Sequence, residues 1–308
     1  MSHRIDIKVG YSCNNHCLFC VQGDKRTRFK SKSCEEVRHI LEKRRPQNDE
    51  VVFTGGEPTI RKDFLTLARI AKGLRYSMIQ AQSNGRMFAY REFCEDAVAS
   101  GVNNFALALH GSTAEIHDRL TCAPGSFEQT VQGIRNLKKL RQKVLTNTVI
   151  TTGNYKDLPR IARFLISLGV NQIQFAFIHM SHVLAANHDL ARTIVARKSA
   201  VKEYVKQGLQ IGIDSNIPAM VEAIPYCFLD GYEQCISDRF FTPTSVEDNV
   251  SYIENFDEYR RQQGKAKGPQ CVACCHYKVC EGPWKSYPEL YGWQEFKPVK
   301  ENSCSNSK

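Results

Sequence analysis

Cysteine is the residue type whose placement in this sequence points most directly to chemistry. Thirteen cysteines occur in 308 residues, and they are not evenly spread. Cys13, Cys17 and Cys20 fall close together near the start, and seven more lie between Cys227 and Cys304. In a chain whose opening residues lack a secretory signal, clustered thiols are more typical of metal ligands than of disulfides. The sequence therefore predicts two metal-binding regions.

The first three thiols follow directly after an expected strand at residues 5–11. Thiolates select iron-sulfur clusters, zinc or copper(I). A four-iron cluster held by only three protein thiolates keeps one iron open for another ligand. A zinc site would instead need a fourth ligand, such as His16 or a distant cysteine. The spacing favours a 4Fe-4S cluster on Cys13, Cys17 and Cys20, with zinc as the alternative.

Two short motifs follow the next two expected strands. Gly55-Gly56-Glu57-Pro58 begins with the last two residues of 50–56, and Ser83-Asn84-Gly85 closes residues 77–85. Glycines let a main chain approach a ligand closely, and a carboxylate can accept a hydrogen bond from an ammonium group. Each motif alone is also typical of an ordinary turn.

The cysteine spacing, with Phe19 just before the last cysteine, and these two motifs in this order together resemble the radical S-adenosylmethionine (SAM) superfamily. The resemblance implies that the open iron binds SAM and that one-electron reduction yields a 5′-deoxyadenosyl radical. It also implies a reductant such as ferredoxin or flavodoxin. SAM-binding residues would then be Gly55, Gly56, Glu57, Ser83 and Asn84.

The fourth expected strand departs from the family pattern. Many relatives carry Ser-Leu-Asp-Gly where this chain has Ala108-Leu109-His110-Gly111, so the usual hydroxyl is missing. Ser112 or Asn147 is expected to supply the polar contact to SAM instead. His110 could act as an acid or base, because imidazole titrates near neutral pH, or it could be structural.

The second group of cysteines is predicted to hold one auxiliary cluster. Cys271 and Cys274 form a CxxC pair, Cys280 follows, and Cys227 upstream completes four thiolates, enough to close a 4Fe-4S cluster. This segment resembles the SPASM and Twitch extensions of radical SAM enzymes, except that Trp284 stands where SPASM domains have a further cysteine. Cys235 and Cys304 are alternative ligands, and a zinc ribbon is the alternative site.

Strands alternate with helices through the first part of the chain, which predicts an α/β fold with a parallel sheet. Six strand-helix units fit a partial (β/α)6 TIM-like barrel better than a closed one. The expected strands are residues 5–11, 50–56, 77–85, 103–111, 144–151 and 171–179. Ligands are expected at the carboxyl ends of these strands.

The alternation stops near residue 190. A helix is expected up to Gly208 and a possible strand at residues 209–215, followed by irregular sequence rich in Pro, Gly, Tyr and Cys. We therefore predict a radical SAM core at residues 1–190 and a smaller cysteine-rich auxiliary domain at residues 191–308. A bound cluster would help to stabilise so irregular a region.

Charge and hydropathy narrow the partners. The formal net charge is +10, and basic residues at 25–32 directly follow the first cysteine motif, where they could attract an anion or form a solvated loop. Nucleic acid is suggested by charge alone. No apolar run is long enough for a signal peptide or a membrane span, so we expect a cytoplasmic protein with no membrane partner.

The sequence thus predicts an enzyme that abstracts hydrogen from a small molecule or peptide, leading to an oxidation, cyclisation or cross-link. The alternatives are a radical SAM enzyme that modifies tRNA and, from a different class, a non-catalytic zinc protein.

Overall fold

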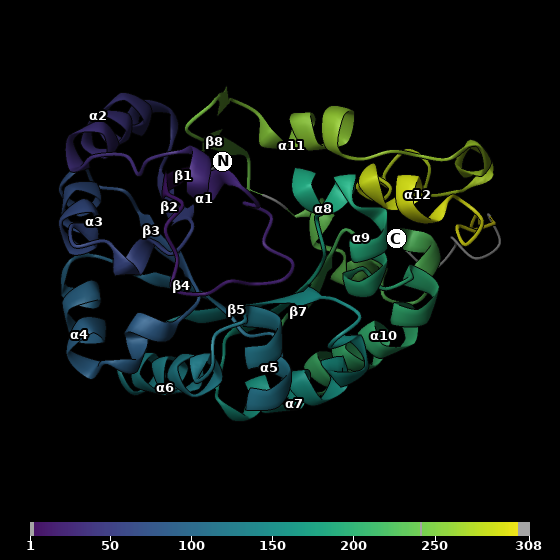
Figure 1. Ribbon diagram of the computed structural model, residues 1–308, viewed down its shortest axis with the longest axis horizontal. Helices are drawn as coiled ribbons and strands as arrows, with labels where there is room; N and C mark the ends of the chain where they lie inside the picture. The colour runs from purple at the N-terminus through teal and green to yellow at the C-terminus, as the bar shows by residue number, and fades with distance from the viewer. Residues whose placement is uncertain (1–2, 241, 301–308) are drawn as a thin grey trace.

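A single curved sheet forms the centre of the molecule in the computed structural model, which describes residues 3–240 and 242–300 (Figure 1). Its nine strands lie in the order β7-β6-β5-β4-β3-β2-β1-β8-β9. All neighbours are parallel except β8 and β9. The strands are β1 Arg4–Gly10, β2 Glu50–Gly55, β3 Met78–Ser83, β4 Asn104–Ala108, β5 Val144–Ile150, β6 Gln172–Phe177, β7 Ala219–Glu222, β8 Thr244–Glu247 and β9 Tyr252–Ile253.

Helices cover the outer face of this sheet, as Figure 1 shows. The helices between successive strands are α1 Lys25–Arg28, α2 Cys34–Arg44, α3 Phe64–Gly73, α4 Arg91–Ala99, α5 Ala114–Thr121, α6 Ser126–Lys139 and α7 Leu158–Ser167. After β6 come α8 His182–Ala186, α9 His188–Ile194, α10 Lys198–Asp214, α11 Phe256–Tyr259 and α12 Ser286–Tyr291. The sheet ends at β7 on one side and β9 on the other, so the predicted open, partial barrel is confirmed.

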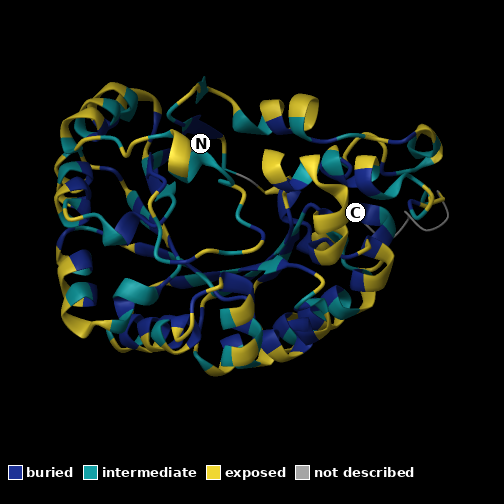
Figure 2. Cartoon of the chain, viewed as in Figure 1, coloured by how far each residue is buried: buried dark blue, intermediate teal, exposed yellow. Residues whose placement is uncertain are grey.

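Side chains alternate along the strands, so that apolar residues face the outer helices and polar residues face the interior of the barrel. In β1, Ile5, Ile7 and Val9 are buried under the helices, whereas Arg4 and Asp6 point to the barrel interior. Figure 2 shows the same pattern of buried and partly exposed positions along the strands. Since successive side chains of a strand point to opposite faces, polar residues here line a hollow interior.

All six expected strands are present, with ends that differ by a few residues. The possible strand at residues 209–215 is wrong, because α10 continues to Asp214. Gly208 suggested a helix end, yet Gly208 and Gly212 both permit close packing. A Cβ would come within 2.8 Å of the Phe175 ring at Gly208 and 2.4 Å of the Ala219 Cβ at Gly212.

The segment after residue 190 contributes to the sheet as well as to the cysteine-rich region. It supplies β7 at one edge and β8, which pairs with β1 in register Arg4 to Thr244. Beyond β9 the chain is mostly irregular, with aromatic packing of Tyr287 against Phe177 and Phe296. The domain boundary near residue 190 stays a prediction. Within the described ranges no helix is both long and apolar enough to cross a membrane.

Candidate active site at the carboxyl ends of the strands

The three N-terminal cysteines gather on one wall of an internal cavity. Cys13, Cys17 and Cys20 all line it, at the carboxyl end of β1. Burial, with Cys20 and Cys13 nearby, raises the pKa of the Cys17 thiol to about 12. The predicted convergence of these thiols is therefore present.

Backbone hydrogen bonds hold the cysteine loop against regular elements. The amides of Gly56 and Glu57 donate to the carbonyls of Gly10 and Ser12, each at 2.8 Å. On the other side, His16 N donates to Thr121 O at 2.8 Å, where α5 ends. The loop is thus fixed between the end of β2 and the end of α5.

Two arginines add side-chain support to the same loop. Arg86 donates to Asn14 O and, at 2.9 Å, to Asn15 Oδ1. Arg26 donates to Asn15 O at 2.6 Å. Because charged donors make the stronger hydrogen bonds, these contacts restrain the backbone on which Cys13 and Cys17 are mounted.

The glycine pair at the end of β2 was expected to let the main chain approach a ligand, but in the structure it also lets two protein segments approach each other. A Cβ at Gly55 would lie 2.2 Å from Gly10 O, and one at Gly56 would lie 2.3 Å from Ser12 O. Gly55 also has φ +123°, which side chains rarely adopt. Both glycines therefore allow close approach between this turn and the cysteine loop, whatever ligand they also contact.

Glu57 joins the two predicted SAM-binding turns to each other. Its buried carboxylate accepts from Ser83 Oγ at 2.8 Å and from Asn84 N at 2.6 Å, besides two bonds from Thr59. Burial raises the pKa of Glu57, while the hydrogen bonds from Thr59, Asn84 and Ser83 oppose that rise. Most of its acceptor capacity is used within the protein.

Asn84 reaches the cysteine loop directly. Its amide nitrogen donates to Asn14 Oδ1 at 2.6 Å and lies 3.8 Å from the Cys13 sulfur. The predicted residues Gly55, Gly56, Glu57, Ser83 and Asn84 all line the cavity that the three thiols share. The structure thus brings these sequence motifs together.

Of the two substitutes expected for the missing strand-four hydroxyl, only Asn147 lines the cavity. Its Oδ1 is buried and has no hydrogen-bond partner among the described residues. Ser112 instead bonds Asp157 through both its amide, at 2.8 Å, and its hydroxyl, at 2.9 Å. The expectation for Ser112 is not supported, since its polar groups are engaged away from the cavity.

His110 lines the cavity, but protein contacts hold its ring. Its Nδ1 accepts a hydrogen bond from Val149 N at 3.2 Å, and its ring packs edge-on against Phe19 at 4.7 Å. Burial, with His117 nearby, lowers its pKa well below the usual value. Of the two roles considered for His110, this geometry favours the structural one.

The cavity extends from the thiols across the barrel to the C-terminal segment. Its volume is about 480 Å³, within the usual range for small-molecule sites. The far wall carries charged and aromatic side chains that sequence reasoning missed: Arg4, Asp6, His179, Glu222, Asp257, Arg260 and Trp284. Only the strand alternation, which directs Arg4 and Asp6 inward, could have indicated part of this wall.

Trp284 connects this wall to the second group of cysteines. Its ring stacks on His179 with centroids 4.0 Å apart, and it lies four positions after Cys280. The residue that replaces an expected cysteine is therefore a cavity-lining aromatic.

The four predicted auxiliary ligands also converge. Cys227, Cys271, Cys274 and Cys280 line one small cavity. Burial raises the pKa of Cys227 to about 12, with Cys280, Cys271 and Cys274 contributing. The alternative ligand Cys235 is buried in the hydrophobic core, and Cys304 lies outside the described residues.

Both groups of thiols supply soft sulfur donors, which suit an iron-sulfur cluster or a zinc ion. The three thiolates of the first loop would leave one iron of a four-iron cluster open, whereas the four around the second cavity could close such a cluster.

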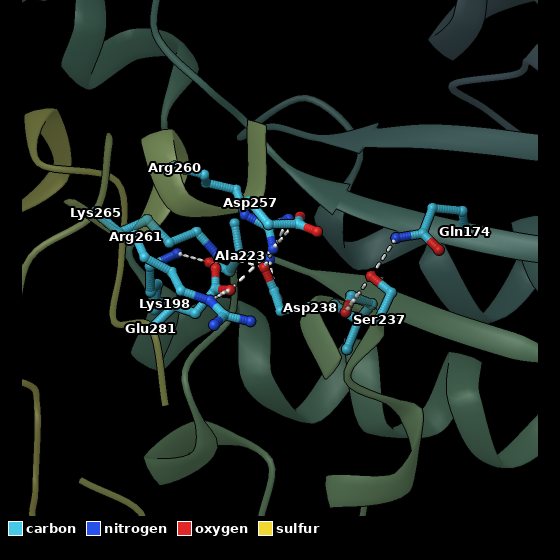
Figure 3. A network of polar contacts seen from close by, with 11 residues as sticks. Gln174, Lys198, Ala223, Ser237, Asp238, Asp257, Arg260, Arg261, Lys265 and Glu281 are labelled. Carbon is cyan, nitrogen blue, oxygen red and sulfur yellow. Dashed lines mark hydrogen bonds and ion pairs between the residues drawn. The ribbon is translucent and has the colours of Figure 1, made fainter. Parts of the chain in front are cut away.

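A buried charge network supports the C-terminal wall (Figure 3). Lys265 pairs with Asp238 and, at 3.0 Å, with Glu281. Arg260 pairs with Glu281 at 2.9 Å and with Asp257 at 3.4 Å. Lys265 and Arg260 are almost fully buried, so their ion pairs compensate for the hydration that these charges lose on folding.

The basic run after the first cysteines serves mainly internal contacts. Lys25 and Lys8 share Asp248, at 2.8 and 2.6 Å, and Lys32 donates to Asn249. Tyr11 also donates to Asp248. The run thus attaches the cysteine loop to the segment after β8, and its predicted role in steering an anion gains no support.

Comparison with known protein families gives a match over the barrel. Residues 7–165 match the model of the radical SAM superfamily. An AdoMet-dependent heme synthase of Oleidesulfovibrio alaskensis is 29% identical over 164 residues, covering 51% of this chain and 42% of the relative. A probable GTP 3′,8-cyclase of Saccharolobus solfataricus is 23% identical, covering 65% and 67%. The match thus spans less than half of the heme synthase.

Solved structures agree in fold. Streptococcus suis SuiB bound to SAM has a TM-score of 0.63 at 16% identity, covering 99% of this chain and 77% of SuiB. Native anSMEcpe with bound AdoMet and a Cp18Cys peptide has a TM-score of 0.68 at 13% identity, covering 98% and 94%. At such low identities the likeness concerns the fold alone.

Proposed function

This chain belongs to the radical SAM superfamily, a family of enzymes, and from that premise we propose that Cys13, Cys17 and Cys20 hold its SAM-binding 4Fe-4S cluster. When bound, that cluster and SAM supply a 5′-deoxyadenosyl radical that takes a hydrogen atom from a substrate. The turns at Gly55–Glu57 and Ser83–Asn84, with Asn147, would bind SAM. Support comes from the single cavity that all these residues line.

We further propose one auxiliary 4Fe-4S cluster on Cys227, Cys271, Cys274 and Cys280. In an oxidation, the substrate loses one hydrogen atom to the radical, then a proton to a base and an electron to an acceptor. The auxiliary cluster would be that acceptor. The observation that carries this proposal is Trp284, which walls the substrate cavity four positions after Cys280.

The substrate in this proposal is a small molecule or a peptide segment, and the product an oxidised, cyclised or cross-linked form. SuiB has been solved with its precursor peptide SuiA, and anSMEcpe with the peptides Kp18Cys and Cp18Cys, which supports a peptide as one substrate class. A ferredoxin or flavodoxin would deliver the electron for SAM cleavage. The nucleic-acid alternative rests on net charge alone, so we do not propose it.

The test uses anaerobically reconstituted protein with dithionite and SAM. We expect about eight irons per chain, by counting two complete clusters, and formation of 5′-deoxyadenosine and methionine. Cys17→Ala should abolish SAM cleavage, whereas Cys34→Ala, at the start of α2 outside both cysteine groups, should retain it. Cys274→Ala should leave about four irons and retain SAM cleavage.

Stoichiometric zinc in place of iron, or unchanged cleavage in Cys17→Ala, would refute the first cluster. Retention of all irons in Cys274→Ala would refute the second. Once a substrate is known, oxidised product made at the normal rate by Cys274→Ala would refute the electron-acceptor role.

A further inference from the structure

We propose that the cavity recognises a positively charged group of the substrate, an ammonium or a guanidinium, through Glu222. The inference rests on the proposed function, because it concerns the substrate of the same site. It assigns a specificity role to a residue that lies outside the family motifs.

Glu222 is placed to contact whatever fills the cavity. It is the last residue of β7 and pairs in register with Ala176 of β6, which also lines the cavity. Its strand neighbours Ala219 and Val221 are buried in the core, so alternation directs Glu222 to the barrel interior. The cysteines of the first loop line the same cavity.

The carboxylate of Glu222 is not paired within the protein. In residues 3–240 and 242–300 no hydrogen bond or ion pair reaches its side chain. The neighbouring cations already have partners, since Lys265 pairs with Asp238 and Glu281, and Arg260 pairs with Glu281 and Asp257. A buried carboxylate is costly unless it is paired with a cation or hydrogen-bonded. Glu222 could therefore pair with a cation that enters the cavity.

The charges around Glu222 also favour a cationic ligand over an anionic one. Among the charged side chains that act on Glu222, the carboxylates of Asp238 and Glu281 disfavour its ionised form, and the cations of Lys265 and Arg260 favour it. With Glu222 itself, three carboxylates stand beside these two cations, and Arg261 contacts Glu281 from the exposed side. The buried Lys198, whose pKa burial lowers well below its usual value, donates instead to Ala223 O at 2.8 Å. A substrate cation would reduce this imbalance, whereas an anion would increase it.

The electrostatics of the free cavity are consistent with this reading. Burial, followed by the nearby Asp238, raises the pKa of Glu222, while Lys265 and Arg260 oppose the rise. A bound cation would favour the ionised carboxylate and so lower that pKa again.

The size of the cavity limits the group that carries the charge. The volume of about 480 Å³ would be shared by the cluster, SAM and the substrate group that enters it. A lysine-like or arginine-like side chain, or a small amine, is a small group that carries the required charge.

The test compares two probes of equal shape and different charge on the reconstituted full chain with SAM bound. N-acetyl-lysine methylamide carries an ammonium, and the corresponding amide of 2-aminoheptanoic acid, whose pentyl side chain has the same number of heavy atoms, is its uncharged counterpart. Calorimetric titration should show the lysine probe binding about tenfold or more tightly, as expected for a hydrogen bond to a charged group. Glu222→Gln should remove this preference and Glu222→Asp should keep part of it.

Glu254→Gln serves as the matched control, because Glu254 is an exposed glutamate outside the cavity, and it should keep the full preference. Equal binding of the two probes to the unmodified protein, or no binding of either, overturns the proposal even if the variants do not fold. A preference that survives in Glu222→Gln also overturns it. Failure of the same preparation to cleave SAM would instead count against the proposed function.

Discussion

Different interactions hold the two groups of cysteine thiols in place. The N-terminal loop is held by main-chain hydrogen bonds to β2 and α5, whose own packing is apolar and regular. The C-terminal region has little regular structure and depends on buried ion pairs around Lys265 and Arg260. The first site is therefore built by the barrel, whereas the second is built by charge pairing and by whatever binds its thiols.

This contrast predicts that removing one charge from the network damages the second region most. Lys265→Met removes one of the two buried cations that Asp238 and Glu281 share, leaving Arg260, and this should cost about 3–5 kcal/mol of stability. Iron content should fall toward about four, the complement of one cluster, because the first loop does not depend on these pairs. Denaturant unfolding and iron analysis measure both effects.

The exposed Lys285, changed to Met, is the control for that experiment and should have little effect. Equal loss of iron from both sites in Lys265→Met would break the comparison, since it would show that the two regions share one cooperative unit.

Mild acid should act on the barrel through its buried histidines. Burial lowers the pKa of His117 to about 4, below the usual value near 6.5. The unfolded chain therefore binds more protons between about pH 6.5 and pH 4, so stability is lost as pH falls through that window. The loss from His117 should reach at most about 3 kcal/mol.

Unfolding free energies at pH 7 and pH 5 measure this loss. His117→Asn keeps an acceptor for the His110 amide, which now donates to His117 Nδ1 at 3.0 Å, but it removes the titrating group. The pH slope should flatten in this variant. An unchanged slope would mean that the histidine is not the source of acid sensitivity in the barrel.

The smallest effect is expected from Arg86, which reinforces a loop already held by main-chain bonds. Arg86→Met removes the donors to Asn14 and Asn15, and the loss should be about 1.5–3 kcal/mol for charged hydrogen bonds. The exposed Arg91, changed to Met, should be nearly neutral. A loss in Arg86→Met larger than that in Lys265→Met would reverse the comparison.

Sequence reasoning reached what is local in the chain. The six strands, the first three cysteines and the group of Cys271, Cys274 and Cys280 follow from short stretches of sequence, whereas Cys227 was added from far upstream to complete four thiolates. The thiols of each set do line a shared cavity. It failed at α10, where a helix end was expected at Gly208, although Gly208 and Gly212 serve contacts with Phe175 and Ala219. A single sequence carries no signal for such a contact, because the partners are distant in the chain.

The far wall of the cavity was missed for the same reason. Glu222, Arg260 and Trp284 come from separate irregular or short segments, and only tertiary packing brings them opposite the cysteine loop. The role of Gly55 and Gly56 was also misread in part, since the atoms they approach belong to the loop after β1. Motif spacing located the turn correctly but could not show what it packs against.

The pairing of β8 with β1 has a consequence for how the chain folds. β1 receives β2 on one side early in synthesis, but its other edge stays open until Thr244–Glu247 has left the ribosome. Contacts this distant in sequence slow folding and prolong the exposure of a strand edge. Asp248 then joins Lys8 and Lys25 immediately after that strand. The first cysteine loop therefore gains its contacts with Asp248 only after the whole barrel sequence that separates them has been made.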